Sequence, residues 1–214
     1  GLDVTTITWR GPAGSATDPL NAMFRAQGAL TAAMVTTPTS AASGASYYPP
    51  GSHAVSVASV GAMAAGGWLT FYGTNDPAFV EYGASQGPLT VWRDLLRVQS
   101  ISASTLRLYE GTCSYHTLTK GASTGTVQIA CQSVDVVERF GFEDLTMDAG
   151  NIANAVLVDY GVDFTALRVG FRNVARFCVE ARYGRGGLVE GCWLGGGVSG
   201  FVGGDAHHDL VVRG

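Results

Sequence analysis

The sequence has few charged side chains and no cluster of basic ones. Its 214 residues include 13 Lys+Arg and 17 Asp+Glu, which gives a formal net charge of -4. Binding to nucleic acid phosphates or to anionic membranes needs a local concentration of Lys and Arg. We therefore expect no nucleic acid partner.

Long apolar runs are absent as well. A membrane-spanning helix is indicated by about 18 or more consecutive apolar residues, and every window of that length here contains Gly, Ser or charged residues. We therefore expect no membrane insertion.

The four cysteines lack the paired spacing of a zinc site. Cys178 and Cys192 occupy apolar strand positions and are predicted to be buried thiols. Cys113 and Cys131 flank a Gly/Ser/Thr-rich stretch, and a disulfide between them is an alternative for an extracellular protein. No phosphate-binding glycine loop or nucleophile elbow occurs either. The sequence predicts neither a metal nor a cofactor.

The chain does contain 30 glycines and a repeated pattern. An apolar residue, a charged residue and a small or amide residue recur in the segments Phe142-Glu-Asp-Leu145, Phe171-Arg-Asn-Val174, Val189-Glu-Gly-Cys192 and Val212-Arg-Gly214. These segments begin at uneven intervals, whereas a second register through Leu145, Leu167, Leu188 and Leu210 is nearly even. Repeats of about 20 to 50 residues indicate stacked units. Short strands between glycine-rich corners favour a parallel β-helix in either register. The residues that we expect to point into its core are Phe142, Phe171, Val174, Cys178, Val189 and Cys192.

One segment has the period of a helix. Asp18-Pro19 fits a helix start, and Leu20, Met23, Phe24, Leu30 and Met34 fall on one face. We expect a helix over residues 18–35 that caps the open end of the solenoid. Residues 1–46 are then an irregular segment with this helix, and residues 47–214 are the start of a longer β-helix. Short strands are predicted at 53–60, 68–72, 90–92, 106–109 and 127–130.

These elements resemble a known family. The helix pattern Thr17-Asp18, Ala22, Ala26 and Ala33, followed by Tyr48-Pro49-Pro50-Gly51-Ser52-His53-Ala54-Val55-Ser56, resembles the first segment of pectate-lyase-like β-helices. Such segments are widespread in bacteriophage tailspikes, tail fibres and virion spikes, and in some secreted polysaccharide-active enzymes. Ser43-Gly44-Ala45 stands where the family has a glycine pair. The resemblance implies an all-β fold, a right-handed single-stranded parallel β-helix, over most of the chain.

The resemblance also implies a function. We expect a virion tail fibre or spike that recognises a bacterial surface polysaccharide, with or without depolymerase activity. Its expected partners are other virion tail or spike proteins and, in a homotrimer, further copies of itself. One alternative is a secreted polysaccharide lyase, hydrolase or epimerase, and another is a purely structural virion segment.

Two carboxylates are candidates for catalysis. Cleavage of a glycan by acid–base chemistry needs two carboxyl groups on one face. Asp159 and Glu180 each follow an apolar pair in the second strand of consecutive repeats. Solvated outward residues explain the same pattern. In the four-segment register, by contrast, Glu143, Arg172, Glu190 and Arg213 form a column of alternating charge, which is typical of structural compensation.

Six further residues are candidates for binding sugars, and of these Tyr160 and Arg182 lie near the carboxylate pair in the sequence. Aromatic rings offer stacking surfaces, and charged side chains offer hydrogen bonds. The candidates are Tyr160, Arg182, Trp193, Asp205, His207 and His208. For the loop around His207, a polar corner between repeats is the alternative.

Overall fold

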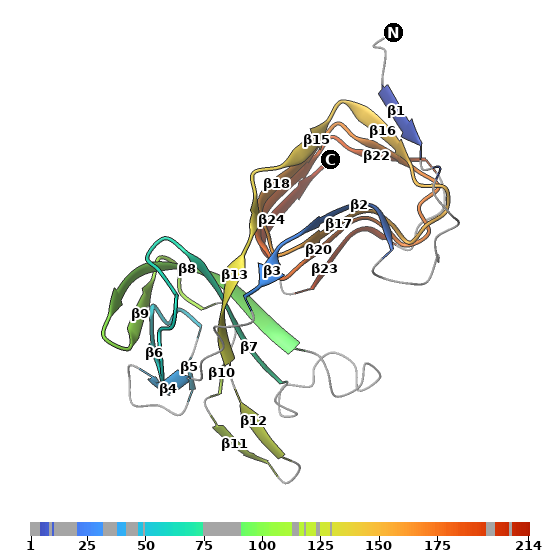
Figure 1. Ribbon diagram of the computed structural model, residues 1–214. Helices are drawn as coiled ribbons and strands as arrows, with labels where there is room; N and C mark the ends of the chain where they lie inside the picture. The colour runs from blue at the N-terminus through green and yellow to red at the C-terminus, as the bar shows by residue number, and fades with distance from the viewer. Residues whose placement is uncertain are drawn as a thin grey trace. The chain divides into compact units, whose positions relative to one another are not determined.

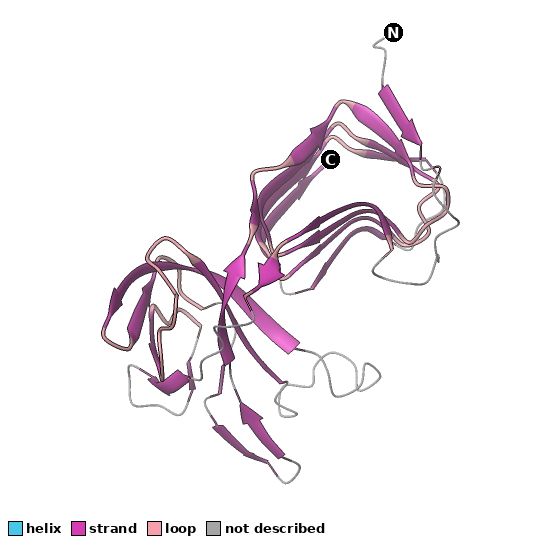
Figure 2. Cartoon of the chain, in the orientation of Figure 1, coloured by secondary structure: helices cyan, strands magenta, loops and turns pink. Residues whose placement is uncertain are grey.

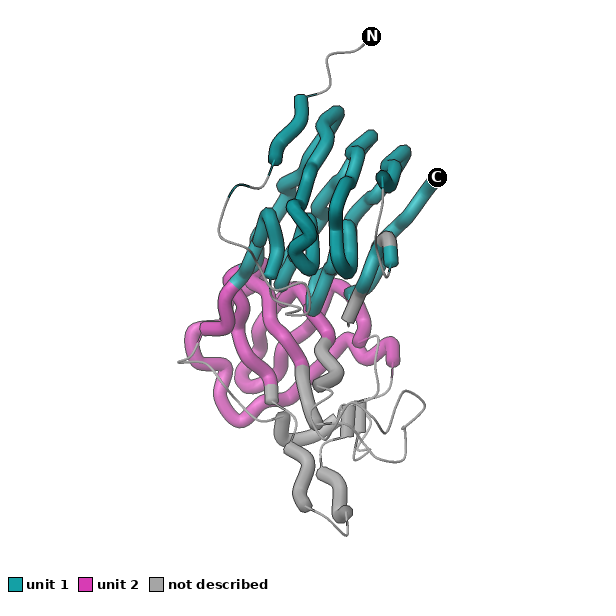
Figure 3. Tube along the Cα trace, turned by 90° about the vertical axis from the view of Figure 1, so that its right-hand side faces the viewer, with its two compact units in different colours: residues 1–28, 136–214 teal, residues 29–135 magenta. Residues whose placement is uncertain are grey.

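The computed structural model describes residues 5–8, 10, 21–31, 38–41, 47–48, 50–74, 91–112, 116–117, 119–122, 125–128, 130–195, 200–205 and 207–214. These residues form strands, turns and irregular segments (Figure 2). They contain no helix, and so none that is long and apolar enough to span a membrane. The chain divides into two compact units, residues 1–28 with 136–214 (unit 1) and residues 29–135 (unit 2), which are coloured separately in Figure 3.

Unit 1 is a parallel β-solenoid of about three turns (Figure 1). Its successive turns add strands to three parallel sheets. Sheet 1 has the order β1 (Thr5–Thr8), β16 (Leu145–Asp148), β19 (Gly170–Arg172) and β22 (Trp193–Gly195). Sheet 2 has the order β2 (Ala22–Gln27), β17 (Asn154–Asp159), β20 (Phe177–Arg182) and β23 (Gly200–Asp205). In sheet 3, β14 (Val137–Glu138) and β15 (Gly141–Glu143) both pair with β18 (Gly161–Leu167), which is followed by β21 (Arg185–Glu190) and β24 (His208–Arg213).

The strand pairing fixes the register of the turns. In sheet 3 the residues opposite one another are Phe142, Ala166, Val189 and Val212. The predicted β-helix is confirmed, but neither expected register holds throughout. The first is wrong at Phe171, which lies in sheet 1 opposite Met147. The second is wrong because Leu167 pairs with Glu143 and Leu210 with Gly187, so its leucines do not share a column.

The capping helix expected at 18–35 is also wrong over the described residues 21–31. Ala22–Gln27 is a strand, and it pairs in parallel with β17 so that Phe24 lies opposite Val156. Phe24 packs against the solenoid core, and its ring centroid lies 5.1 Å from that of Phe142. Met23 and Phe24 thus pack against the core from an extended backbone, because β17 offers unpaired backbone groups that a strand can satisfy.

The core of unit 1 fills the space between the three sheets. Its fully buried side chains include Met147, Phe164 and Phe171. The six residues that the repeat pattern places inside are confirmed there, since all belong to this core or pack against it: Phe142, Phe171, Val174, Cys178, Val189 and Cys192. Cys178 and Cys192 are free, and burial raises the pKa of the Cys178 thiol to about 12.

The corners between the sheets repeat in register. Non-glycine residues with positive φ stand at equivalent places of successive turns, as in Asp144 (52°) and Arg168 (53°), followed by Gly191 (60°). A second column of this kind contains Arg139, Asp163, Gly186 and Asp209. Left-handed residues bend the chain sharply, and they are uncommon for residues other than Gly, Asn and Asp. Asp144, Arg168 and Gly191 each donate a backbone hydrogen bond to the next turn, as do Arg139 and Tyr160. These bonds hold the turns in step at the corners.

Unit 2 contains antiparallel sheets in place of the parallel sheets of unit 1. Its seven-stranded sheet has the order β3 (Ala29–Leu30), β13 (Ala130–Asp135), β7 (Trp68–Thr74), β8 (Val91–Ser102), β9 (Thr105–Leu108), β6 (Ala54–Val57) and β4 (Pro38–Ala41). Two further pairs are β5 (Tyr47–Tyr48) with β10 (His116–Thr117) and β11 (Thr119–Ala122) with β12 (Gly125–Gln128).

All of these strands pair antiparallel. The predicted strands of this region overlap observed ones, but they do not continue the β-helix, whose turns lie in residues 5–27 and 137–213. The compact units accordingly do not divide at residues 46 and 47. Cys131 is a free thiol in the core of unit 2, and burial raises its pKa to about 12. Cys113 lies outside the described residues.

Replacing Phe171 with Asp tests the core assignment. Phe171 is fully buried, whereas Leu194, its neighbour in the next turn of the same column, is 40% exposed. Burying an unpaired carboxylate costs several kcal/mol, so we expect Phe171→Asp to lower the free energy of unfolding by several kcal/mol and Leu194→Asp by much less. Denaturant unfolding followed by circular dichroism measures both. Equal stability of the two variants would contradict the core assignment.

Candidate functional site

The predicted carboxylate pair lies on neighbouring strands of sheet 2. Asp159 ends β17 and Glu180 lies in β20, while the neighbouring Val158 and Val179 belong to the core. Glu180 stands opposite Leu157, whereas Asp159 stands opposite Arg182. The two carboxylates are therefore displaced along the strands and do not occupy equivalent positions in consecutive turns. Both residues are nearly inaccessible, with exposures of 3% and 5%.

Arginines from the two adjacent strands contact Asp159. The Nε and Nη2 atoms of Arg182, on β20, donate to Oδ1 and Oδ2 of Asp159 at 2.7 and 2.8 Å. Nη2 of Arg25, on β2, lies 3.4 Å from Oδ2. Such a two-pronged pair between guanidinium and carboxylate is among the stronger polar contacts in proteins. One carboxylate thus ties together three consecutive turns of the solenoid.

Glu180 has a weaker set of partners. Nη1 of Arg176 lies 3.3 Å from its Oε2, and the side chain of Asn154 hydrogen bonds to it. Burial raises the pKa of the Glu180 carboxyl; Arg176, Arg182 and Asn154 oppose this shift, and Asp159 adds to it. A carboxyl with a raised pKa beside a carboxylate paired with cations is the combination that acid–base cleavage of glycans uses. The pair has suitable electrostatics, but its burial leaves little access for a substrate.

Two of the predicted sugar-binding residues are part of the same cluster. Tyr160 is 7% exposed and packs on Tyr183 with ring centroids 5.6 Å apart. The guanidinium carbon of Arg182 lies 5.9 Å from the Tyr183 ring. Tyr160 therefore acts as a packing residue in this structure. The backbone of Asp205 pairs with Arg182 on the adjacent strand.

The two histidines lie at the start of β24 in sheet 3: His207 directly precedes this strand and His208 is its first residue. Nε2 of His207 is 2.9 Å from the carbonyl oxygen of Gly186, and its ring meets the Phe164 ring edge-on at 5.7 Å. Burial lowers the pKa of His207. His208 begins β24 opposite Arg185. Both side chains are half-buried.

Trp193 is the most exposed of the predicted sugar-binding residues whose side chains are described. It is 44% exposed at the start of β22. Its ring lies directly over Gly170 of the preceding turn, where a side chain would collide with it. The guanidinium carbon of Arg172 lies 5.2 Å from the ring centroid. This arrangement holds an accessible indole ring against the solenoid wall.

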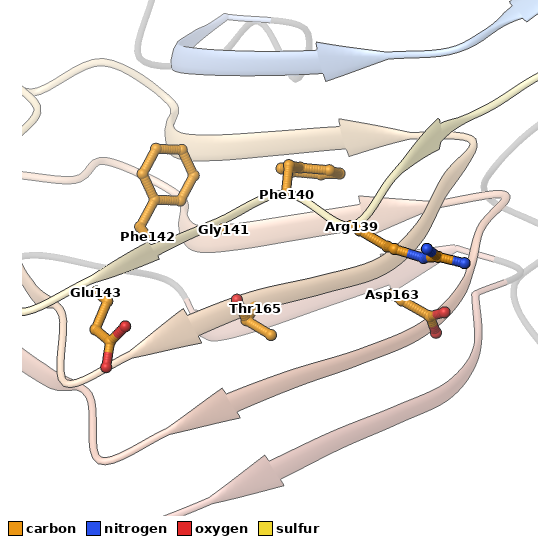
Figure 4. A pocket seen from close by; sticks show the side chains of 7 residues that line it. All are labelled: Arg139, Phe140, Gly141, Phe142, Glu143, Asp163 and Thr165. Carbon is orange, nitrogen blue, oxygen red and sulfur yellow. The ribbon is translucent and has the colours of Figure 1, made fainter.

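A pocket that sequence reasoning missed lies on sheet 3. It has a volume of about 350 Å³ and is lined by Arg139, Phe140, Gly141, Phe142, Glu143, Asp163 and Thr165 (Figure 4). All of these residues come from β15, β18 and the segment just before β15. The observed register, in which Glu138 pairs with Val162, makes Arg139 and Asp163 neighbours in adjacent turns.

No protein-family model matches the sequence, and no curated protein is significantly similar to it. Solved structures do share the architecture. The gp54 tailspike of Acinetobacter baumannii bacteriophage AP22, solved in complex with A. baumannii capsular saccharide, matches 79% of this chain with a TM-score of 0.53 and 13% identity. The gp61 tailspike of Pseudomonas phage phi297 matches 97% of this chain with a TM-score of 0.52 and 13% identity.

The chain has a tailspike-like fold. It spans 39% and 37% of the length of these two tailspikes. At this level of identity the likeness concerns the course of the backbone. Which side chains of a tailspike-like solenoid carry function must be argued from the residues themselves.

Removing the cation that pairs with Asp159 tests whether the buried cluster is structural. Breaking a buried ion pair by deleting one partner typically costs about 3–5 kcal/mol. We expect Arg182→Gln to lower the free energy of unfolding by that amount, and we expect the double variant Arg182→Gln, Asp159→Asn to recover part of the loss. Thermal and denaturant unfolding of the two variants measure this difference. If Asp159→Asn instead abolished a glycan-cleaving activity at unchanged stability, the structural assignment would be wrong.

Proposed function

We propose that this chain is part of a phage tail spike whose β-solenoid presents a recognition surface to a bacterial surface polysaccharide. The observation that carries the proposal is the likeness of its fold to phage tailspikes, one of them solved in complex with capsular saccharide. At the finer level, we propose that the solenoid is of the pectate-lyase-like type.

Surface features of unit 1 support a sugar-binding role. Trp193 offers an accessible ring beside the Arg172 guanidinium, and aromatic side chains of this kind combine an apolar face with a polar edge. The pocket on sheet 3 offers charged and hydroxyl groups in a concave site. Polyhydroxylated ligands need both kinds of contact.

The proposed setting is a virion, with the chain assembled as a homotrimer among other tail or spike proteins. The support for this setting is the likeness of the fold to phage tailspikes.

A second candidate function is cleavage of the bound glycan by Asp159 and Glu180. It is favoured by the raised pKa of the Glu180 carboxyl beside the arginine-paired Asp159. In this proposal Glu180 donates a proton to the leaving glycosidic oxygen, while Asp159 accepts a proton from a water molecule that attacks the anomeric carbon, so that the new C–O bond forms as the glycosidic bond breaks. The polysaccharide reaches the pair only if the side chains that bury it move.

A panel of purified bacterial capsular polysaccharides tests both functions. We expect the full chain, immobilised for biolayer interferometry, to bind at least one member of the panel and to discriminate against others. Release of reducing ends or unsaturated sugars from the bound polysaccharide would report cleavage, and loss of that release in Glu180→Gln would assign it. Failure to bind any polysaccharide in a broad panel would contradict the recognition proposal.

A further inference from the structure

The pocket on sheet 3 is framed by a corner column of the solenoid. Arg139 and Asp163 are consecutive members of the column of left-handed corner residues, with φ angles of 53° and 55°. Their side chains therefore leave the wall at the same corner in adjacent turns. Figure 4 shows both side chains at one end of the pocket, Glu143 at the other end and Thr165 between them.

Asp163 does not fill the space beside Arg139. A side chain on Gly186, the next residue of the column, would collide with Oδ1 of Asp163, so the carboxylate lies against the following turn. Within the described part of the chain, the side chains of Arg139 and Asp163 form no ion pair with each other. Charged groups at adjacent corners that leave each other unpaired are available to a ligand.

The Glu143 side chain is held at one end of the pocket by Arg168. Its Oε1 accepts a hydrogen bond from Nη2 of Arg168, which also pairs with Asp144 through Nε at 2.6 Å. The Arg168 hydrogen bond lowers the pKa of the Asp144 carboxyl. Among the described residues, this cluster engages only one carboxylate oxygen of Glu143, which lines the pocket with its other oxygen available to further donors.

The floor of the pocket depends on a glycine. A side chain on Gly141 would collide with Oγ1 of Thr165. The backbone of β15 therefore approaches β18 closely here and leaves the Thr165 hydroxyl as the polar group of the floor. The Phe140 and Phe142 rings pack against the solenoid core, and the Phe142 ring lies on the opposite side of β15 from Glu143 (Figure 4).

The size of the pocket and the side chains that line it indicate which class of ligand it can bind. Its volume is at the small end of the range of about 300–1,000 Å³ for ligand sites, which suits one sugar residue better than an oligomer. A guanidinium, two carboxylates and a hydroxyl match neighbouring sugar hydroxyls, which both donate and accept hydrogen bonds. The carboxylates of Glu143, Asp144 and Asp163 outnumber the guanidiniums of Arg139 and Arg168. The resulting excess of negative charge disfavours acidic sugars.

We infer that this pocket binds one neutral sugar residue of a bacterial surface polysaccharide through adjacent hydroxyl groups held by Arg139, Glu143, Asp163 and Thr165. The inference rests on the proposed function and assigns it to a site. Trp193, on another sheet of the solenoid, lies outside this subsite.

Binding to sugar-bearing polymers tests the inference. The probes are polyacrylamide conjugates of glucose, galactose and N-acetylglucosamine as neutral sugars, and of glucuronic acid and N-acetylneuraminic acid as acidic ones. We expect the full chain to bind at least one neutral conjugate more tightly than either acidic one. We expect Asp163→Asn and Arg139→Asn to weaken that binding at least tenfold, since Asn tolerates the left-handed corner and removes the charge.

Glu190→Gln is the matched control for a third variant, Glu143→Gln. Glu190 occupies the same column as Glu143 two turns further on and lies outside the pocket. The control should bind as the unmodified protein does, whereas Glu143→Gln should bind more weakly. Thr165→Val removes the floor hydroxyl at nearly constant shape and serves if a corner variant fails to fold, as judged by its circular dichroism.

Each outcome decides between the proposals. Binding of a capsular polysaccharide that all pocket variants retain would overturn the pocket assignment and leave the proposed function standing. Preference for the acidic conjugates, or binding of a capsular polysaccharide with no neutral conjugate bound, would overturn the assignment of ligand class. No binding to any conjugate or polysaccharide would overturn both proposals.

Discussion

Parallel pairing of each turn with the next is the constraint on which the rest of unit 1 depends. It places Val156, Val179 and Val202 above one another and so builds the core as a set of columns. Adjacent strands in a sheet lie about 4.7–4.9 Å apart, and residues of the same column are therefore always neighbours. The same pairing brings Asp159 against Arg182 and places Arg139 one turn before Asp163.

The stacking of similar turns requires unfavourable backbone conformations at the corners between the sheets. Each turn must bend between three sheets, and the chain does so with left-handed residues that include Arg139, Arg168 and Tyr160. Such conformations are unfavourable for these residue types, and backbone hydrogen bonds to the next turn at the same positions offset that cost. The corners are also where side chains of successive turns converge outside the core, so the ionic cluster around Arg168 and the pocket beside Arg139 both lie there. The stacking of the turns and the proposed recognition of sugar thus depend on the same positions.

Sequence reasoning predicted the β-helix and its inward residues because apolar periodicity and turn residues are local signals. It missed the strand around Phe24, whose conformation depends on Val156, a partner far away in the sequence. The sequence also did not predict the correct register of the turns, because Phe142 and Phe171 look equivalent in the repeat pattern but lie in different sheets. The predicted column of alternating charge is wrong for the same reason, since Glu143 pairs with Arg168 and not with Arg172.

The candidate site was predicted only in part. Asp159 and Glu180 were placed on the correct sheet, but their burial is a property of packing that no single strand reveals. The pocket could not be found, because Arg139 and Asp163 give no signal until the register of sheet 3 is known.

The central claim is that residues 22–27 form the strand next to β17 in this register. Two neighbouring strands bring paired Cα atoms within the roughly 4.4–6.8 Å that a disulfide requires. Cysteines introduced at Ala26 and Val158, which lie opposite one another, should therefore form a disulfide on mild oxidation, identified by peptide mass spectrometry. The pair Ala26 and Val156, displaced along the strand and hence about 8 Å apart from strand geometry, should not. Efficient cross-linking of the displaced pair, or none in the matched pair, would contradict the account of the first turn and its register.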